Sequence, residues 1–176
     1  MAVAPAVDVV EGTVVFTDIV GFTSFTEEEG DDRALEVLGV QEEVVSDTIS
    51  DGARVVKELG DGLMLWFPDA ASAVAVSLCL QAALAQRYEV EEFPLWVRVG
   101  AHAGTQRYRR GDLVGHDVNV AARIVDLAGP GEVLVSDATL QQVGGELEGA
   151  TFVEVGPVIV KGIADPVWIH RVEAST

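Results

Sequence analysis

Apolar and polar residues alternate along this chain with two different periods, which predicts a mixture of strands and helices. Runs of β-branched and aromatic residues between turns are typical of strands, whereas apolar positions three or four residues apart are typical of helices. The predicted strands are residues 12–17, 53–58, 63–67, 95–103, 113–114, 133–135, 152–155, 158–160 and 167–172. The predicted helices are residues 22–29, 31–50, 68–86, 118–127 and 137–143.

The order of these elements predicts an α+β fold. One strand is followed by two helices, a hairpin, a helix, a second hairpin and another helix, so the sheet should be mostly antiparallel. The chain has 176 residues, of which 49% are hydrophobic, and this is enough for one domain with one core. We expect that domain to cover residues 11–174, after a flexible N-terminus at residues 1–10.

The charge of the chain argues against several classes of partner. Its formal net charge is −18, whereas nucleic-acid binding needs a basic face and an anionic membrane surface attracts basic segments. Residues 70–86 carry no charge, but they are short and interrupted by polar side chains, so they predict a buried helix rather than a transmembrane segment. A single cysteine, Cys79, allows no internal disulfide and favours the cytoplasm.

The stretch VVFTDIVGFTSF, residues 14–25, places a carboxylate, Asp18, where an apolar strand ends. The backbone N–H groups that follow would open a helix and form an anion site. A carboxylate beside an anion site suits a phosphate with a divalent cation between them. The alternative interpretation is that Asp18 only caps the following turn.

A second carboxylate, Asp61, lies in KELGDG at the tip of a predicted hairpin. If strands 12–17 and 53–58 are neighbours, Asp18 and Asp61 converge, as paired carboxylates do in two-metal phosphoryl-transfer sites. The alternative is an ordinary Asp-Gly turn.

A third segment, RRGDLVGHDVNVAARI, covers residues 109–124 and predicts a helix with Asn119 and Arg123 on one face. An arginine fork suits a phosphate whose charge is changing. The alternative is a helix whose Asn and Arg simply face water.

Together these segments resemble the class III adenylyl and guanylyl cyclase catalytic domain, of the bacterial adenylyl cyclase type. The matching stretches are FTDIVGFT (16–23), KELGDG (57–62), RVGAHAG (98–104), GDLVGHDVNVAAR (111–123) and VKGI (160–163). They occur in the family's order and with family-like spacing. The resemblance implies a ferredoxin-like, palm-type sheet with helices packed on it, and a head-to-tail homodimer.

The resemblance also implies roles for individual residues. Asp18 and Asp61, with the backbone carbonyl of Ile19, would hold two divalent ions, Mg²⁺ or Mn²⁺, and the segment with Phe22 and Thr23 would bind phosphates. The other matching positions are Lys57 and Asp112 for reading the purine, Asn119 for orienting the ribose, Arg123 for stabilising the transition state, and Lys161 for contacting a phosphate.

These roles imply an adenylyl cyclase that converts ATP to 3′,5′-cyclic AMP and pyrophosphate. The ribose 3′-hydroxyl attacks the α-phosphate, so no side-chain nucleophile is required. Adenine offers an N6 donor to Asp112 and an N1 acceptor to Lys57, whereas guanine reverses that edge. In the family geometry the aspartates of one chain face the purine readers and the arginine of another, so we expect a homodimer with inactive monomers. A regulatory domain, linked or separate, is a further partner that the resemblance allows.

Two alternatives within the family stay open, namely a weak or inactive cyclase-like domain that dimerises or senses nucleotide, and a guanylyl cyclase. Other aspartate-dependent classes fit less well. A haloacid dehalogenase-type phosphatase would need an aspartate where Val20 stands. A P-loop or Rossmann protein would need glycine spacings that the chain lacks, and a receiver domain would need a parallel βαβ order.

Overall fold

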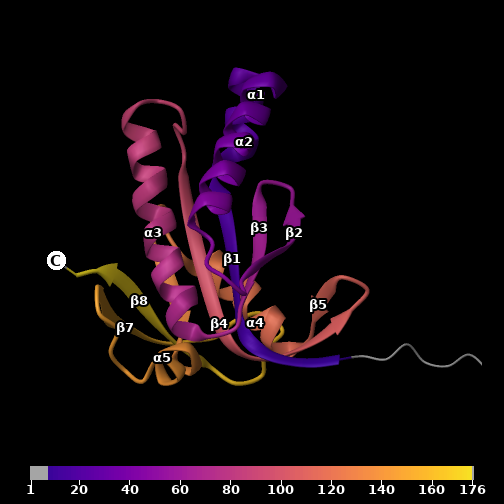
Figure 1. Ribbon diagram of the computed structural model, residues 1–176, viewed down its shortest axis with the longest axis vertical. Coiled ribbons are helices and arrows are strands. Elements are labelled where there is room, and N and C mark those ends of the chain that lie inside the picture. Colours follow the sequence, from indigo (N-terminus) through magenta and orange to yellow (C-terminus); the bar gives the residue numbers. More distant parts are fainter. Residues whose placement is uncertain (1–7, 176) are drawn as a thin grey trace, which may run out of the picture.

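A single sheet with helices on both faces forms the body of the protein in the computed structural model, which describes residues 8–175 (Figure 1). The strands are β1 (Asp8–Val20), β2 (Arg54–Leu59), β3 (Gly62–Phe67), β4 (Trp96–Arg109), β5 (Asp112–Val114), β6 (Val133–Ser136), β7 (Ala150–Val158) and β8 (Val167–Ala174). The helices are α1 (Phe22–Glu29), α2 (Asp31–Thr48), α3 (Ala70–Glu89), α4 (His116–Leu127) and α5 (Asp137–Val143).

The strand order in the sheet is β2-β3-β1-β4-β6-β8-β7, and β5 pairs with β4 outside this path. Within residues 8–175 each strand pairing is antiparallel except that of β4 with β6. The α+β, mostly antiparallel fold predicted from the sequence is therefore confirmed.

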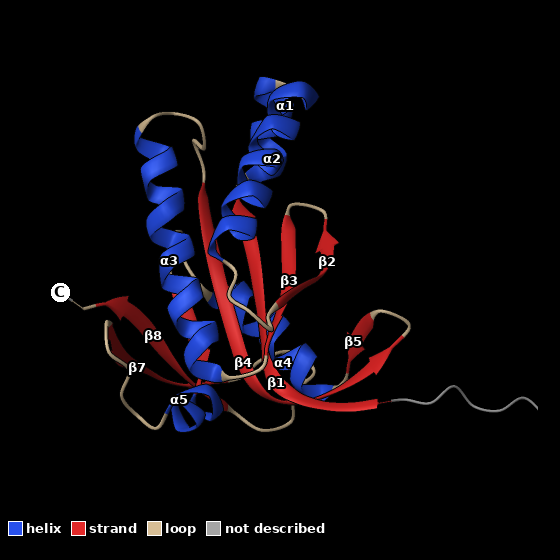
Figure 2. Cartoon of the chain, viewed as in Figure 1, coloured by secondary structure: helices blue, strands red, loops and turns tan. Residues whose placement is uncertain are grey.

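Side chains of β1 alternate between two layers of the core, because successive residues of a strand point to opposite faces of the sheet. Val15 and Ile19 pack with the cluster that includes buried residues of α2 and α3. Val14 and Phe16 pack with Val118 and other buried residues of α4. Helices α2 and α3 therefore cover one face of the sheet and α4 the other, as Figures 1 and 2 show from the same side.

The two central strands are longer than the sequence predicted. β1 and β4 pair from Asp8↔Tyr108 to Val20↔Trp96, and this continuous ladder extends both strands beyond their most apolar parts. Residues 8–10 therefore belong to β1 rather than to the expected flexible N-terminus, and residues 1–7 lie outside the described part of the chain.

Two further details differ from the sequence interpretation. β3 lies between β1 and β2, so the strands near 12–17 and 53–58 do not meet the condition of being neighbours. The predicted strands 152–155 and 158–160 form one strand, β7, which ends at Val158. Gly156 and Pro157 do not break it, because the ladder shifts register there and β7 is an edge strand, where proline is tolerated.

Helix α3 meets the length and hydropathy expected of a membrane span. In this fold one side of it packs into the core through Ala73, Val74, Leu80 and Leu84. Asp69 caps its first turn by accepting a hydrogen bond from the Ser72 N–H at 2.7 Å. The packing agrees with the buried helix that the sequence predicted.

Candidate active site

The candidate site lies where β3 diverges from β1. The pairing of β1 with β3 ends at Thr17↔Leu63, whereas β1 continues along β4 as far as Val20. Asp18 is therefore the first residue of β1 beyond the β3 ladder, and its Cα partner on β4 is Arg98. The end of the β3 ladder leaves space beside the Asp18 carboxylate.

A cavity of about 440 Å³ opens at this point. It is lined by four residues that the sequence singled out, from β1, α4 and the β7–β8 connection: Asp18, Asn119, Arg123 and Lys161. Helix α4 presents Asn119 and Arg123 on one face, as the four-residue spacing predicted. One chain thus brings a carboxylate, an amide and two cationic side chains to a single cavity.

Asp61 lies in the turn between β2 and β3, next to Gly62, which lines the same cavity. Burial raises the pKa of the Asp61 carboxyl above its ordinary value, and the negative charge of Asp18 adds to the rise. Gly62 lies against the Thr17 carbonyl, so the turn that carries Asp61 lies near the end of β1. It is β3 rather than β2 that lies beside β1.

The two carboxylates suit a hard divalent cation. Among the described residues, no three His, Cys, Asp or Glu side chains cluster as a metal site. Mg²⁺, however, is commonly held by one or two carboxylates together with substrate phosphates. Asp18 and Asp61, with the carbonyl of Ile19, are the groups that would hold such a cation, and a cation would offset the unfavourable charge on Asp61.

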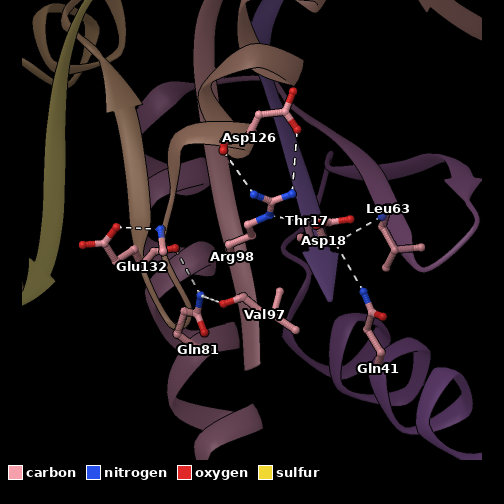
Figure 3. A network of polar contacts seen from close by, with 10 residues as sticks. Thr17, Asp18, Gln41, Leu63, Gln81, Val97, Arg98, Asp126 and Glu132 are labelled. Atoms are coloured by element: carbon pink, nitrogen blue, oxygen red, sulfur yellow. Dashed lines mark hydrogen bonds and ion pairs between the residues drawn. The ribbon is translucent and has the colours of Figure 1, made fainter. Parts of the chain in front are cut away.

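The sequence interpretation missed the counter-ion of Asp18, which is Arg98 (Figure 3). Arg98 Nε donates to Asp18 Oδ2 at 2.7 Å, and its Nη1 donates to the Asp126 backbone carbonyl at 3.1 Å. The Arg98 guanidinium therefore links the end of β1 to the end of α4. The only sequence signal was a lone cation in the predicted strand 95–103, and without the strand register its partner could not be identified.

The end of α4 carries a second contact of the same kind. Arg123 Nη1 lies 3.5 Å from Asp126 Oδ2, and Arg98 Nη2 lies 3.8 Å from Asp126 Oδ1. Asp126 thus faces two guanidinium groups, and Asp126 and Arg123 both line the cavity. Because Arg123 and Asp126 are both well exposed, this ion pair is weak and leaves Arg123 free to turn toward a ligand.

Lys57 and Asp112 lie apart from the residues that line the cavity, and they contact each other. Lys57 Nζ donates to Asp112 Oδ2 at 2.7 Å, which joins β2 to β5. The ladder of β2 with β3 shifts register between Val55 and Lys57, and such a bulge re-aims the side chains that follow it. The other carboxylate oxygen, Asp112 Oδ1, accepts the Leu113 N–H at 2.8 Å.

The segment after Asp18 has the local structure that the sequence predicted. Gly21 adopts φ 76°, a left-handed conformation that suits glycine, and α1 starts at Phe22. Phe22 packs partly buried against the core, whereas Thr23 is exposed at the first turn. Ile19 is buried with 2% of its surface exposed, so its side chain belongs to the core rather than to the site.

This fold, with Asp18 at the end of β1, Asp61 in the turn between β2 and β3 and an Asn–Arg face on α4, is that of a nucleotide cyclase catalytic domain. Residues 5–173 match the family model described as the adenylate and guanylate cyclase catalytic domain, and the chain belongs to this family. The expected family membership is confirmed.

Two curated relatives are adenylate cyclases. A putative adenylate cyclase 3 from Rhizobium meliloti is 34% identical over 159 residues, which cover 89% of this chain and 27% of the relative. A pH-sensitive adenylate cyclase from Mycobacterium tuberculosis is 32% identical over 162 residues, which cover 91% of this chain and 40% of the relative. The chain thus spans less than half the length of these relatives.

Solved structures with the same fold include both kinds of cyclase. The adenylyl cyclase CyaB from P. aeruginosa superposes with a TM-score of 0.86 at 24% identity, covering 97% of each chain. The guanylyl cyclase Cya2 superposes with a TM-score of 0.81 at 26% identity, covering 96% of this chain and 94% of the other. The fold is therefore common to both activities, and the base that is read must depend on side chains.

Proposed function

We propose that this chain is an adenylyl cyclase catalytic domain, which converts ATP to 3′,5′-cyclic AMP and pyrophosphate. The observation that carries the proposal is the cavity that Asp18, Asn119 and Arg123 line together, with the turn that carries Asp61 beside it. When bound, two divalent cations would lower the pKa of the ribose 3′-hydroxyl and hold the triphosphate.

Three side chains of the cavity have separate roles in the proposed reaction. Arg123 brings positive charge to the α-phosphate, where negative charge grows as the 3′-hydroxyl attacks and pyrophosphate leaves. Asn119 lies one helical turn away and can orient the ribose through its amide. Lys161, in the β7–β8 connection, borders the same cavity and can contact a phosphate.

ATP is the proposed substrate because Lys57 and Asp112 present one donor group and one acceptor group side by side, 2.7 Å apart. With Asp112 facing position 6 of the purine and Lys57 facing N1, the pair matches the N6 donor and the N1 acceptor of adenine. In the same placement it mismatches O6 and N1–H of guanine. A mismatched buried polar group costs about 1–3 kcal/mol. Adenine must part the two side chains to bind between them.

We propose further that each active site is shared between two subunits. Within residues 8–175 the cavity beside Asp18 is lined by neither Lys57 nor Asp112 of the same chain. A nucleotide with its phosphates at Asp18 would then take its purine contacts from a second copy in a homodimer. On this proposal Arg123 also acts across the interface, although one chain already places it at the cavity.

The test is to incubate the purified protein with ATP or GTP and Mn²⁺, and to identify the product by mass. The expected result is cyclic AMP from ATP, much less cyclic GMP from GTP, and no product with Asp18→Ala. Asp47→Ala, which changes an exposed aspartate on α2, is the matched control and should keep full activity. Cyclic GMP as the main product, or no product from the wild type, would overturn the proposal.

A further inference from the structure

A buried hydroxyl joins the two segments that carry the paired aspartates (Figure 3). Thr17 Oγ1 accepts the Leu63 N–H at 3.1 Å and the Gln41 Nε2–H at 3.3 Å. Thr17 and Gln41 each expose only 2% of their surface. A buried donor or acceptor is costly when it is left unpaired, so this three-membered contact is strongly favoured over its loss.

The contact lies at the point where the strands diverge. Thr17 immediately precedes Asp18, and Leu63 follows Asp61 by two residues. Gly62 lies so close to β1 that a Cβ on it would come within 2.5 Å of the Thr17 carbonyl oxygen. The turn that carries Asp61 is therefore pressed against β1 at the last residue before Asp18.

The Thr17 hydroxyl bonds to Gln41 of α2, whereas Asp18 lines the cavity together with residues of α4. Neighbouring residues of a strand point to opposite faces of the sheet. Thr17 also borders the cavity, but it exposes only 2% of its surface, and its hydroxyl is occupied by Gln41 and Leu63. Thr17 is therefore well placed to fix where Asp18 and Asp61 lie.

We infer that Thr17 and Gln41 are positioning residues that hold the Asp61 turn against Asp18, so that the two carboxylates form one cation site. The inference rests on the proposed function, in which this pair holds the metal. Like charges at close range repel, and the Gln41–Thr17–Leu63 contact opposes their separation in the absence of a cation. Outer contacts of this kind typically change metal affinity 10- to 100-fold when they are removed.

The experiment measures Mn²⁺ binding to the whole chain by electron paramagnetic resonance, together with hydrogen exchange at the Leu63 amide. Thr17→Val keeps the shape of the side chain and removes the hydroxyl, whereas Thr17→Ser keeps the hydroxyl. The matched control is Thr13→Val on the same strand, because the Thr13 hydroxyl is equally buried and has no hydrogen-bond partner among the described residues.

Thr17→Val should weaken Mn²⁺ binding about 10- to 100-fold. It should also speed exchange at Leu63. Thr17→Ser should restore both properties, and Thr13→Val should leave both unchanged. Wild-type Mn²⁺ affinity in Thr17→Val, or an equal loss in Thr13→Val, would overturn the inference.

Two further outcomes are informative. If Thr17→Val does not fold, Gln41→Met removes the second partner and should weaken Mn²⁺ binding in the same direction. Unchanged affinity in that variant would contradict the inference. If the wild type binds Mn²⁺ with these dependences but forms no cyclic nucleotide, the proposed function fails while the positioning role stands, since neither readout requires turnover.

Discussion

Gly100 is the position where a single added carbon should disturb both stability and activity. It lies on β4 under α4, and an alanine Cβ there would lie 2.6 Å from the Val125 Cα and closer still to the Val125 backbone nitrogen. Carbon atoms in contact normally lie about 3.5–4.0 Å apart, so α4 would have to move by about 1 Å. Such overpacking typically costs about 1–3 kcal/mol of unfolding free energy.

The same displacement should slow the reaction, because α4 carries Asn119 and Arg123. A misplacement of about 1 Å can cost roughly 100-fold in rate. Urea unfolding and the rate of cyclic AMP formation measure the two effects in Gly100→Ala. The matched control is Gly39→Ala on α2, where no atom lies within 4 Å of the added carbon.

Gly39→Ala should gain roughly 0.5–1 kcal/mol of stability, because glycine is unfavourable inside a helix. If Gly100→Ala kept both the stability and the rate of the wild type, the result would contradict the close packing of α4 against β4 at Gly100.

Three further predictions concern single side chains. Burial lowers the pKa of His102 below its ordinary value of 6.5, although Asp117 opposes the shift. The unfolded chain then binds a proton before the folded one does, so the free energy of unfolding should fall below pH 6.5, by up to about 1.4 kcal/mol per pH unit. Unfolding curves should show a shallower acid slope for His102→Gln, and equal slopes would refute the assignment. Arg98→Met should lower the unfolding free energy by about 1 kcal/mol, since it leaves Asp18 without its counter-ion. That deficit should shrink in saturating Mn²⁺, and a deficit that Mn²⁺ does not change would count against a cation at Asp18. Lys57→Glu should reduce kcat/KM for ATP roughly 10- to 100-fold, because a carboxylate cannot donate to N1 of adenine. An unchanged value would rule out purine reading by this residue.

Local patterns were sufficient to predict much of the fold. The sequence predicted α1 and α5 with the bounds that the structure has, and the Ser136 side chain caps the start of α5 by accepting the Thr139 N–H. Gly156 and Pro157 misled the interpretation, because the sequence does not reveal that β7 is an edge strand with a bulge. The separation of β1 from β2 by β3 was likewise hidden, since strand order depends on contacts between distant residues.

In the candidate site, too, local motifs could be predicted from the sequence, whereas contacts between distant residues could not. The resemblance to a family identified Asp18 and Asp61, and the structure places the turn that carries Asp61 against β1 at Thr17. Arg98 was missed because its contact with Asp18 joins residues 80 positions apart, and only the register of β1 with β4 brings them face to face. Gln41 was missed for the same reason, since a polar residue on a helix normally indicates an exposed face.

The lining of the cavity bears on whether Asp18 and Arg123 act within one subunit or across two. The resemblance distributes the aspartates and Arg123 over two subunits, whereas one chain places Asp18 and Arg123 at the same cavity. The absence of Lys57 and Asp112 from the lining of that cavity, among residues 8–175, supports the shared arrangement. A purine contact supplied by a second chain would make dimerisation a condition for activity.

Mixing two inactive variants tests the shared site most directly. Asp18→Ala and Arg123→Ala, each inactive alone, are combined in equal amounts, and cyclic AMP formation is measured while heterodimers are counted by native mass spectrometry. Random pairing makes half of the dimers mixed, and each mixed dimer has one intact site, so roughly a quarter of the wild-type activity should return. A mixture that stays inactive while heterodimers form would contradict a site in which Asp18 of one subunit works with Arg123 of the other.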